Sequence, residues 1–444
     1  MLTRRQFAVS AGLPALLSGA QKRAPRLLLR SSWQEVNIGD IGHTPGALSI
    51  LTRYLPEAEL TLWPAALSEA SRAMLTKGYP KLKFVEGTLQ DGKPATPALA
   101  KAWEETDLYL SGSGSGFPSS NLALAFLKAT NKPVGVFGVS TDPISGFGGG
   151  REPEGGTLQQ LREKAAKLPP THLPADLRYL IDRAAFFFCR DTISRDYLKA
   201  QGVKTPVLEF GCDAQMGMHL RDDARADAFL KAKGLEPGKF IAVIPRLRYT
   251  PYYRIRKQAR VPDDDVKDAI NNRTVESDHA RLREMMIAYV RKTGRKVLAC
   301  AEMTYQVELA KEVLVDPLPA DVKKNVVWRD TFWLPDEAAS VYTHANAVIS
   351  VECHSPLIAY RNGTPAFYVR QPSDTCKGQM YRDFGAGDWF FEVEETSGEQ
   401  LWSRLEPIVA NPAKGKAQVS KIMGNVNARY QRMADVARRA CRVG

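Results

Sequence analysis

Short apolar segments bounded by turn residues alternate with longer amphipathic segments along nearly the whole chain. An apolar run without polar alternation is typical of a strand with both faces buried, as in a parallel sheet covered by helices on each side. The runs are RLLLRS, ELTLWP, DLYLSGS, PVGVFGVS, AAFFFCRD and TPVLEF in the first half, then IAVIPR, KVLACAE, NVVWRD, NAVISVE, PAFYVR and WFFEV. The sequence therefore predicts an α/β fold built on parallel sheets.

This alternation is interrupted by a charged helical segment and a Pro-Gly turn at residues 219–240. Because 444 residues exceed the usual size of one hydrophobic core, we expect two domains. The expected parts are Rossmann-like N-terminal and C-terminal domains at 21–235 and 236–400, and a helical segment at 401–444 that could cross back to the first domain. Such domains bind ligands at the carboxyl ends of their strands, so we expect a site in the cleft between them.

The first twenty residues form a segment of another kind. Arg4 and Arg5 precede Phe7 and a short, weakly apolar stretch that ends in SGA, an acceptable cleavage site after Ala20. The pattern is that of a twin-arginine export signal, and the alternative is an ordinary N-terminal helix with a chance arginine pair. We expect export to the periplasm or another extracytoplasmic compartment, with membrane contact only during that step.

The charge balance narrows the choice of partners. A net charge of +12 favours anionic partners. The positive residues are dispersed and no nucleic-acid-binding signature is present, so we do not expect nucleic acid as a partner. None of the six cysteines is spaced as Cys-x-x-Cys and most lie in apolar runs, which predicts buried, reduced thiols.

Signals for cofactors are weak. Two glycine-rich segments, SGSGSGFPSS and GFGGGREPEGG, lack the Gly-Lys-Ser/Thr of a phosphate-binding loop and the full dinucleotide fingerprint. The first follows an apolar run, so its amides could face the cleft, whereas we expect the second to be a surface loop. The histidines are scattered and no Cys, His and carboxylate group has metal-site spacing. We therefore expect no cofactor and no metal.

Polar residues follow three of the predicted strands, where a ligand site of this fold class would lie. The candidates are Asn37, Gly39, Asp40 and His43 after RLLLRS, Arg190 and Ser194 after FFFC, and Glu352, His354 and Ser355 after VISV. Asn37 and Asp40 could contact a ligand or cap the following helix. Arg190 could bind an anion or pair with Asp191 or another acid.

Taken in order, these motifs resemble those of the polysaccharide pyruvyl transferase family, whose fold is like that of the two-domain GT-B glycosyltransferases. The family's Asn-x-Gly-Asp loop matches residues 37–40, and its Arg-Asp/Glu-x-x-Ser segment matches residues 190–194. Its late Arg-x-His motif, with a helix and a Gly-x-Pro turn, matches at His354 and at residues 363–365. The resemblance implies that pyruvate is attached from phosphoenolpyruvate to glycan hydroxyls as a ketal, without a metal.

Glu352 departs from this pattern because it occupies the position of the family's arginine. A carboxylate there repels an anionic donor such as phosphoenolpyruvate. Export also separates the protein from a donor that is made in the cytoplasm. Both observations leave the donor and the reaction open.

Glu352 and His354 are the expected catalytic residues. If VISVECH stays extended to its end, residues two apart project from the same face, so these two side chains should lie side by side. The carboxylate would then raise the pKa of the histidine, which suits a general acid or an anion-binding cation. The alternative is a structural histidine at a helix end.

Two basic segments could replace the missing arginine. Arg246 and Arg248 lie in PRLRYTPYYRIRK, and Arg370 and Lys377 lie in VRQPSDTCKGQMYR. Guanidinium groups among tyrosines suit acidic sugars, and a solvated loop is the alternative. We therefore expect a transferase that moves a pyruvyl or related group to a cell-envelope glycan. The alternatives are a non-catalytic binding module for acidic glycans and a hydrolase or lyase of acidic sugars.

Overall fold

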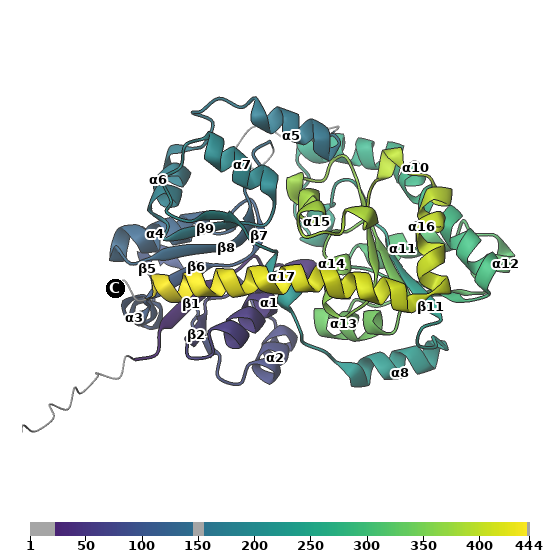
Figure 1. Ribbon diagram of the computed structural model, residues 1–444, viewed down its shortest axis with the longest axis horizontal. Helices are drawn as coiled ribbons and strands as arrows, with labels where there is room; N and C mark the ends of the chain where they lie inside the picture. The colour runs from purple at the N-terminus through teal and green to yellow at the C-terminus, as the bar shows by residue number, and fades with distance from the viewer. Residues whose placement is uncertain (1–22, 145–154, 442–444) are drawn as a thin grey trace, which may run out of the picture.

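The computed structural model describes residues 23–144 and 155–441 (Figure 1). The predicted export signal at residues 1–20 and most of the segment GFGGGREPEGG lie outside these ranges. Within them, no helix is long and apolar enough to cross a membrane.

The N-terminal half forms a parallel sheet with the strand order β10-β9-β8-β6-β1-β2-β3, and β7 pairs with β8. Every residue of β6, β8 and β9 is buried, as predicted for strands covered on both faces. The strands are β1 (Arg26–Arg30), β2 (Glu59–Leu62), β3 (Lys83–Phe84), β6 (Leu108–Ser111), β7 (Gly114–Ser115), β8 (Val134–Ser140), β9 (Phe186–Cys189) and β10 (Leu208–Phe210), with a separate antiparallel pair, β4 (Leu89–Gln90) and β5 (Lys93–Pro94).

Helices cover both faces of this sheet. Trp103 of α3, Phe126 of α4 and Ile181 of α6 belong to a core on one face, whereas Leu48 of α1 belongs to a core that continues into the second domain. The helices are α1 (Ile38–Tyr54), α2 (Glu69–Gly78), α3 (Pro97–Glu105), α4 (Ser120–Thr130), α5 (Leu158–Ala166), α6 (Ala175–Arg183), α7 (Thr192–Ala200) and the short η1 (Ala214–Gly217).

The C-terminal half forms a second parallel sheet with the strand order β13-β12-β11-β14-β15-β16. Its strands are β11 (Phe240–Ile244), β12 (Lys296–Ala299), β13 (Val326–Trp328), β14 (Ala347–Ser350), β15 (Ala366–Arg370) and β16 (Phe390–Glu392). Each strand of both sheets that was predicted from an apolar run is present. The predicted α/β class with two parallel sheets is therefore confirmed.

The helices of the second half surround this sheet, with α10 against α16 and with α13 against α8 and α14 (Figure 1). They are α8 (Asp223–Lys233), α9 (Tyr252–Ile255), α10 (Pro262–Thr293), α11 (Gln306–Ala310), η2 (Lys311–Val315), α12 (Ala320–Lys323), α13 (Pro335–Thr343), α14 (Ser355–Arg361), η3 (Cys376–Gly378), α15 (Gln379–Asp383), η4 (Gly387–Trp389), η5 (Val393–Glu395), α16 (Gly398–Ala410) and α17 (Pro412–Ala440). Five of the six cysteines are buried, as expected.

The last helix, α17, runs from the second domain back across the first, as the long yellow helix in Figure 1 shows. The Tyr430 hydroxyl donates a hydrogen bond to the Asp213 carbonyl at 2.5 Å. Arg432 forms an ion pair with Glu209 at 2.6 Å. This helix therefore fastens the first domain to the second through a buried hydrogen bond and surface charge.

Candidate functional site

A pocket of about 220 Å³ lies between the two sheets, at the carboxyl ends of β1, β11 and β14. In each sheet the strand order reverses at these strands, which is where open α/β sheets bind ligands. The lining residues are Ser32, Gln34, Asn37, Asp40, His43, Ser115, Arg190, Arg246, Tyr249, Thr250, Tyr252, Lys267, Met303, Glu352, His354, Ser373, Asp374, Thr375 and Lys377.

A larger hollow, of about 570 Å³, opens beside β2 and α2 of the first domain. Its lining is mainly apolar, with Leu55, Leu60 and Tyr79 among the contributing residues. We place the functional site in the smaller pocket because charged and titratable groups from both domains converge there.

The loop before α1 joins the two domains at the pocket. The Asn37 side chain caps α1 by accepting hydrogen bonds from the Gly39 amide at 2.7 Å and the Asp40 amide at 3.4 Å. The Ile38 amide donates to the Glu302 carbonyl of the second domain at 3.0 Å. Asn37 therefore caps the helix and also lines the pocket, so the two predicted roles coexist.

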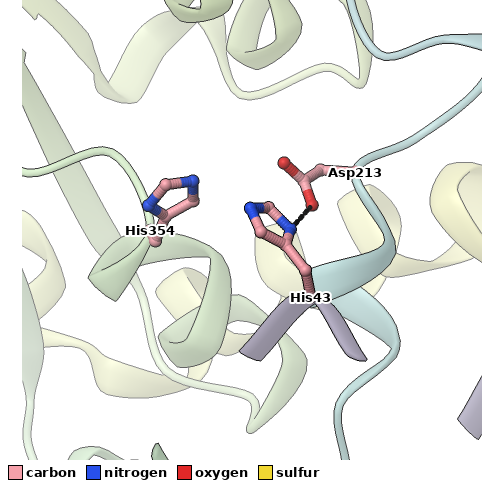
Figure 2. A group of neighbouring side chains, drawn as sticks. All are labelled: His43, Asp213 and His354. Atoms are coloured by element: carbon pink, nitrogen blue, oxygen red, sulfur yellow. Dashed lines mark hydrogen bonds and ion pairs between the residues drawn. The ribbon is translucent and has the colours of Figure 1, made fainter. Parts of the chain in front are cut away.

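A buried hydrogen-bond network, the first-domain wall, consists of His43, Arg190 and Asp213. The Nη1 atom of Arg190 donates to Asp213 Oδ2 at 2.5 Å, and His43 Nδ1 lies 3.0 Å from Asp213 Oδ1 (Figure 2). Burial opposes ionisation of Asp213, but His43 and Arg190 outweigh it and hold the pKa of the carboxyl well below its usual range. Asp213 is therefore ionised, and it is the acid that partners Arg190.

Asp191, the acid next in sequence to Arg190, has a different role. Its side chain caps α7 by accepting from the Ser194 amide at 2.7 Å, and it also accepts from the Ser140 and Ser194 hydroxyls. Ser194 is fully buried in this cap and does not line the pocket. Within the Arg-Asp-x-x-Ser motif, Arg190 therefore lines the pocket, whereas Asp191 and Ser194 hold the start of α7.

The second-domain wall consists of Arg246, Glu352, Asp374 and Lys377. Arg246 Nε lies 3.2 Å from Glu352 Oε1, Arg246 Nη1 lies 3.3 Å from Asp374 Oδ2, and Lys377 Nζ lies 2.9 Å from Asp374 Oδ1. The Nε and Nη1 atoms of Arg246 are buried, yet neither forms a hydrogen bond with the residues that the structure describes. Burial raises the pKa of Glu352, Arg246 opposes this, and the pKa lies at about 7. Glu352 also accepts a hydrogen bond from Gln306 Nε2 at 2.7 Å, so within this wall it is Arg246 that is held by charge and not by aligned hydrogen bonds.

The prediction that Glu352 pairs with His354 is wrong. The strand β14 ends at Ser350, whose hydroxyl accepts from the Glu352 amide and donates to the Glu352 carbonyl, so the chain turns before His354. The carboxylate beside His354 is Glu302, with Oε1 at 3.1 Å from Nδ1. Burial and the neighbouring His43 lower the pKa of His354 to about 3. His354 is therefore a neutral imidazole and cannot be the predicted general acid.

Glu302 and Asp213 are the site residues that the sequence reading missed. Glu302 Oε2 accepts from the Ser355 amide at 2.6 Å and the Ser355 hydroxyl at 2.7 Å, and burial raises the pKa of Glu302 to about 7. Both acids follow apolar runs, in VLACAE and VLEFGCD, and this position is a signal that could have found them.

The remaining predicted binding residues do not line the pocket. Arg248 pairs with Asp278 at 2.8 Å, and Arg370 pairs with Glu392 at 2.8 Å. A buried guanidinium requires such a partner, so both arginines are committed to internal ion pairs. Ser355 holds Glu302, and Gly39 lies behind His354, where a Cβ atom would come within 2.3 Å of its Nδ1.

One group among the described residues could hold a metal ion. The ligand atoms of His43, Asp213 and His354 lie within 4.8 Å of one another, and all three residues are buried. Spacing along the sequence could not reveal this group, because its members come from three distant segments.

Solved structures with similar folds include two complexes with UDP and one with UDP-GlcNAc. S. aureus MnaA with UDP has a TM-score of 0.52 at 10% identity, covering 89% of this chain and 90% of that one. The UDP-GlcNAc 2-epimerase from Neisseria meningitidis bound to UDP-GlcNAc has a TM-score of 0.52 at 10% identity, covering 94% and 100%. A ugt transferase from Siraitia grosvenorii in complex with UDP has a TM-score of 0.52 at 11% identity, covering 92% and 99%. A search of the curated proteins gave no significant match.

Two parallel-sheet domains with a pocket at the carboxyl ends of their strands define a protein of the GT-B glycosyltransferase fold. Within this class, the polysaccharide pyruvyl transferase family model matches residues 37–372, a range that includes all three predicted motifs. The chain belongs to this family of glycan-modifying transferases, and the predicted resemblance is confirmed.

Proposed function

We propose that this protein transfers a pyruvyl group, or a related carboxylated group, to a cell-envelope glycan as a ketal. Membership of the polysaccharide pyruvyl transferase family supports the reaction type. The twin-arginine pattern of the first twenty residues supports action outside the cytoplasm. The donor is an enol ester of the phosphoenolpyruvate kind.

The observation that carries this proposal is a protonatable carboxyl group in the pocket. Ketal formation from an enol ester requires a proton on the methylene carbon while a glycan hydroxyl oxygen bonds to the adjacent carbon. The leaving group departs with its bonding electrons when the second hydroxyl closes the ketal, and both hydroxyl protons are released. Glu352, with a pKa of about 7, can hold the required proton near neutral pH, whereas His354 is neutral and leaves Nε2 free to face the ligand.

The size of the pocket also supports a compact donor. Its volume of about 220 Å³ lies below the roughly 300 to 1,000 Å³ typical of pockets for drug-sized ligands. A three-carbon acid with one leaving group needs far less room than the nucleotide sugars in the solved structures of similar fold.

Turnover by the purified mature protein tests this proposal directly. We expect phosphate release and a new glycan ketal when phosphoenolpyruvate and isolated envelope glycans are supplied together. Because Glu352 must be protonated, kcat/KM should fall as the pH rises above about 7. Glu352→Gln should lower kcat by about 100-fold or more, which is the usual contribution of a general acid.

The control is Glu394→Gln, because Glu394 is a half-exposed acid that pairs with Arg248 outside the pocket. This variant should retain activity and the same pH profile. Absence of phosphate release by folded protein, or full activity of Glu352→Gln, would contradict the proposal.

A binding module without turnover is the second candidate. It is favoured by Arg246, whose Nε and Nη1 donors face the pocket region without an aligned acceptor and could hold a sugar carboxylate. In that case Arg246→Ala should abolish glycan binding measured by calorimetry, and Glu352→Gln should preserve it.

A further inference from the structure

His43 and His354 approach each other from opposite domains at the pocket. Their ring centroids lie 5.1 Å apart, with the rings nearly perpendicular. His43 lies in the first turns of α1, whereas His354 immediately precedes α14. Figure 2 shows a nitrogen of each ring pointing into the gap between them.

Both histidines are oriented by a carboxylate on the other ring nitrogen. Asp213 Oδ1 lies 3.0 Å from Nδ1 of His43, and Glu302 Oε1 lies 3.1 Å from Nδ1 of His354. A carboxylate at Nδ1 keeps the proton on that nitrogen and leaves a lone pair on Nε2. Histidines that bind metals are held in this way by acids that do not themselves touch the ion.

The acids are fixed in turn by further hydrogen bonds. Asp213 also accepts from Ser113 Oγ at 2.8 Å, from the Gln215 amide at 3.0 Å and from Arg190. Its oxygens are therefore occupied, so it orients His43 and is not free to be a ligand. Glu302 is held in the same way through its second oxygen by Ser355.

One of the two Nε2 atoms lacks a hydrogen-bond partner among the described residues. Nε2 of His354 is buried without a hydrogen bond among the described residues, and a buried polar atom in this state carries a desolvation cost. A cation in the gap would give this atom a partner, and the His43 ring lies close enough to supply a second ligand.

We infer that a divalent transition metal ion binds between Nε2 of His43 and Nε2 of His354. Imidazole ligands suit zinc and its first-row neighbours, and the other coordination positions are left to water or to an anionic group of the ligand. The nearby cations do not prevent this, because Arg190 is paired with Asp213 and Lys377 with Asp374. The ion would supply an uncommitted positive charge beside Glu352. This inference does not depend on the transferase proposal.

Calorimetry with zinc and absorption spectroscopy with cobalt test the site. The mature protein is prepared without a histidine tag and stripped of metal with a chelator. We expect one zinc ion per chain, and visible cobalt bands that zinc abolishes. His43→Ala and His354→Ala should each weaken zinc binding by about 100-fold or more. Glu302→Gln should weaken it by about 10-fold to 100-fold, as removal of an orienting acid does.

His344→Ala is the matched control, because His344 pairs with Asp227 near the surface and lies outside the pocket. This variant should bind zinc with unchanged affinity. Circular dichroism verifies folding of each variant, and Glu302→Gln keeps the shape of the side chain if an alanine variant fails to fold. Absence of zinc and cobalt binding at millimolar metal overturns the inference, as does unchanged affinity in the folded pocket variants. Zinc binding without any turnover would leave this inference intact and contradict only the transferase proposal.

Discussion

On the first-domain wall, Arg190 donates a 2.5 Å hydrogen bond to Asp213, and both oxygens of that carboxylate are occupied. On the second-domain wall, Arg246 lies 3.2 Å from Glu352 and 3.3 Å from Asp374 without an aligned hydrogen bond from the atoms concerned. The walls carry similar charges and both contain hydrogen-bonded acids, but only the second has a buried guanidinium whose Nε and Nη1 donors lack a hydrogen bond among the described residues. The second retains donors and a proton that a ligand can use.

The pKa values of Asp213 and Glu352 also differ between the two walls. Asp213 stays ionised because His43 and Arg190 outweigh the effect of burial on its pKa. Glu352 has a pKa of about 7, because burial favours its protonated form and Arg246 compensates only in part. A fixed charge suits positioning, whereas a group that gains and loses a proton near neutral pH suits chemistry.

The largest expected effect comes from removing one arginine at a time. Arg190→Met should lower the free energy of unfolding by about 3 to 5 kcal/mol, because it leaves the buried Asp213 without its cation. Arg246→Met should cost less, about 1 to 2 kcal/mol, since Lys377 still faces Asp374 and Glu352 can take up a proton. Urea denaturation at pH 7 measures both. Equal losses of unfolding free energy in the two variants would contradict the proposed difference between the walls.

The next largest effect should be a dependence of stability on pH that comes from Glu352. Its pKa rises from 4.5 to about 7 on folding, so the folded protein keeps a proton that the unfolded chain releases. The stability from this group is present below pH 4.5 and is lost as the pH rises to about 7, by on the order of 3 kcal/mol.

Comparison of the unmodified protein with Glu352→Gln isolates this effect. The pKa of His354 is lowered to about 3, so its contribution runs the other way and is lost as the pH falls below 6.5. The unfolding free energy of the unmodified protein minus that of Glu352→Gln should fall steadily between pH 4.5 and 7. A constant difference would mean that Glu352 does not titrate in this range.

A smaller effect is expected at Gly39, which packs against His354 and Glu302 of the second domain. In Gly39→Ala the new Cβ would lie 2.3 Å from His354 Nδ1 and 2.7 Å from Glu302 Oε1. Overpacking of this kind costs about 1 to 3 kcal/mol. The control is Gly424→Ala on the exposed face of α17, where nothing lies within 4 Å and alanine should stabilise the helix by about 0.5 to 1 kcal/mol. Thermal unfolding of both variants measures these changes in stability. Unchanged stability of Gly39→Ala would show that His354 and Glu302 move readily to make room for the new methyl group.

The smallest effect should come from outside the pocket. Arg432 on α17 pairs with Glu209, and both side chains are at least one-third exposed. Arg432→Ala should therefore cost no more than about 1 kcal/mol and should lose even this difference at high salt. Thermal unfolding measures this variant as well. If Arg432→Ala loses more stability than Gly39→Ala, then α17 contributes more to the stability of the pocket than we expect.

Local patterns in the sequence were sufficient for the fold. The run AAFFFCRD predicted β9 correctly. An uninterrupted apolar segment of this length is typical of a strand in the middle of a sheet that is covered on both faces. Asn37 gave the start of α1 because its side chain can accept hydrogen bonds from the next amides. The ordered motifs also indicated the family and the edge of the sheets where the pocket lies.

Local pattern failed at β14. The alternation in VISVECH favours a strand through His354, but the Ser350 hydroxyl binds the backbone of Glu352 and turns the chain. A serine inside an apolar run carries no sign of whether its hydroxyl will face a neighbour or its own backbone. The role of His354 changed as a result, from a charged acid to a neutral imidazole.

The sequence by itself determined the two parallel sheets and the residues at the strand ends, because these depend on neighbours in the chain. The tertiary structure alone decided that Asp213 partners Arg190 and His43, that Glu302 partners His354, and that the two histidines face each other. Ion pairs and pKa values depend on distance and burial in space, and the carboxylates and their partners lie 23 to 170 residues apart in the sequence. The chemistry of the pocket is therefore a property of the packed domains.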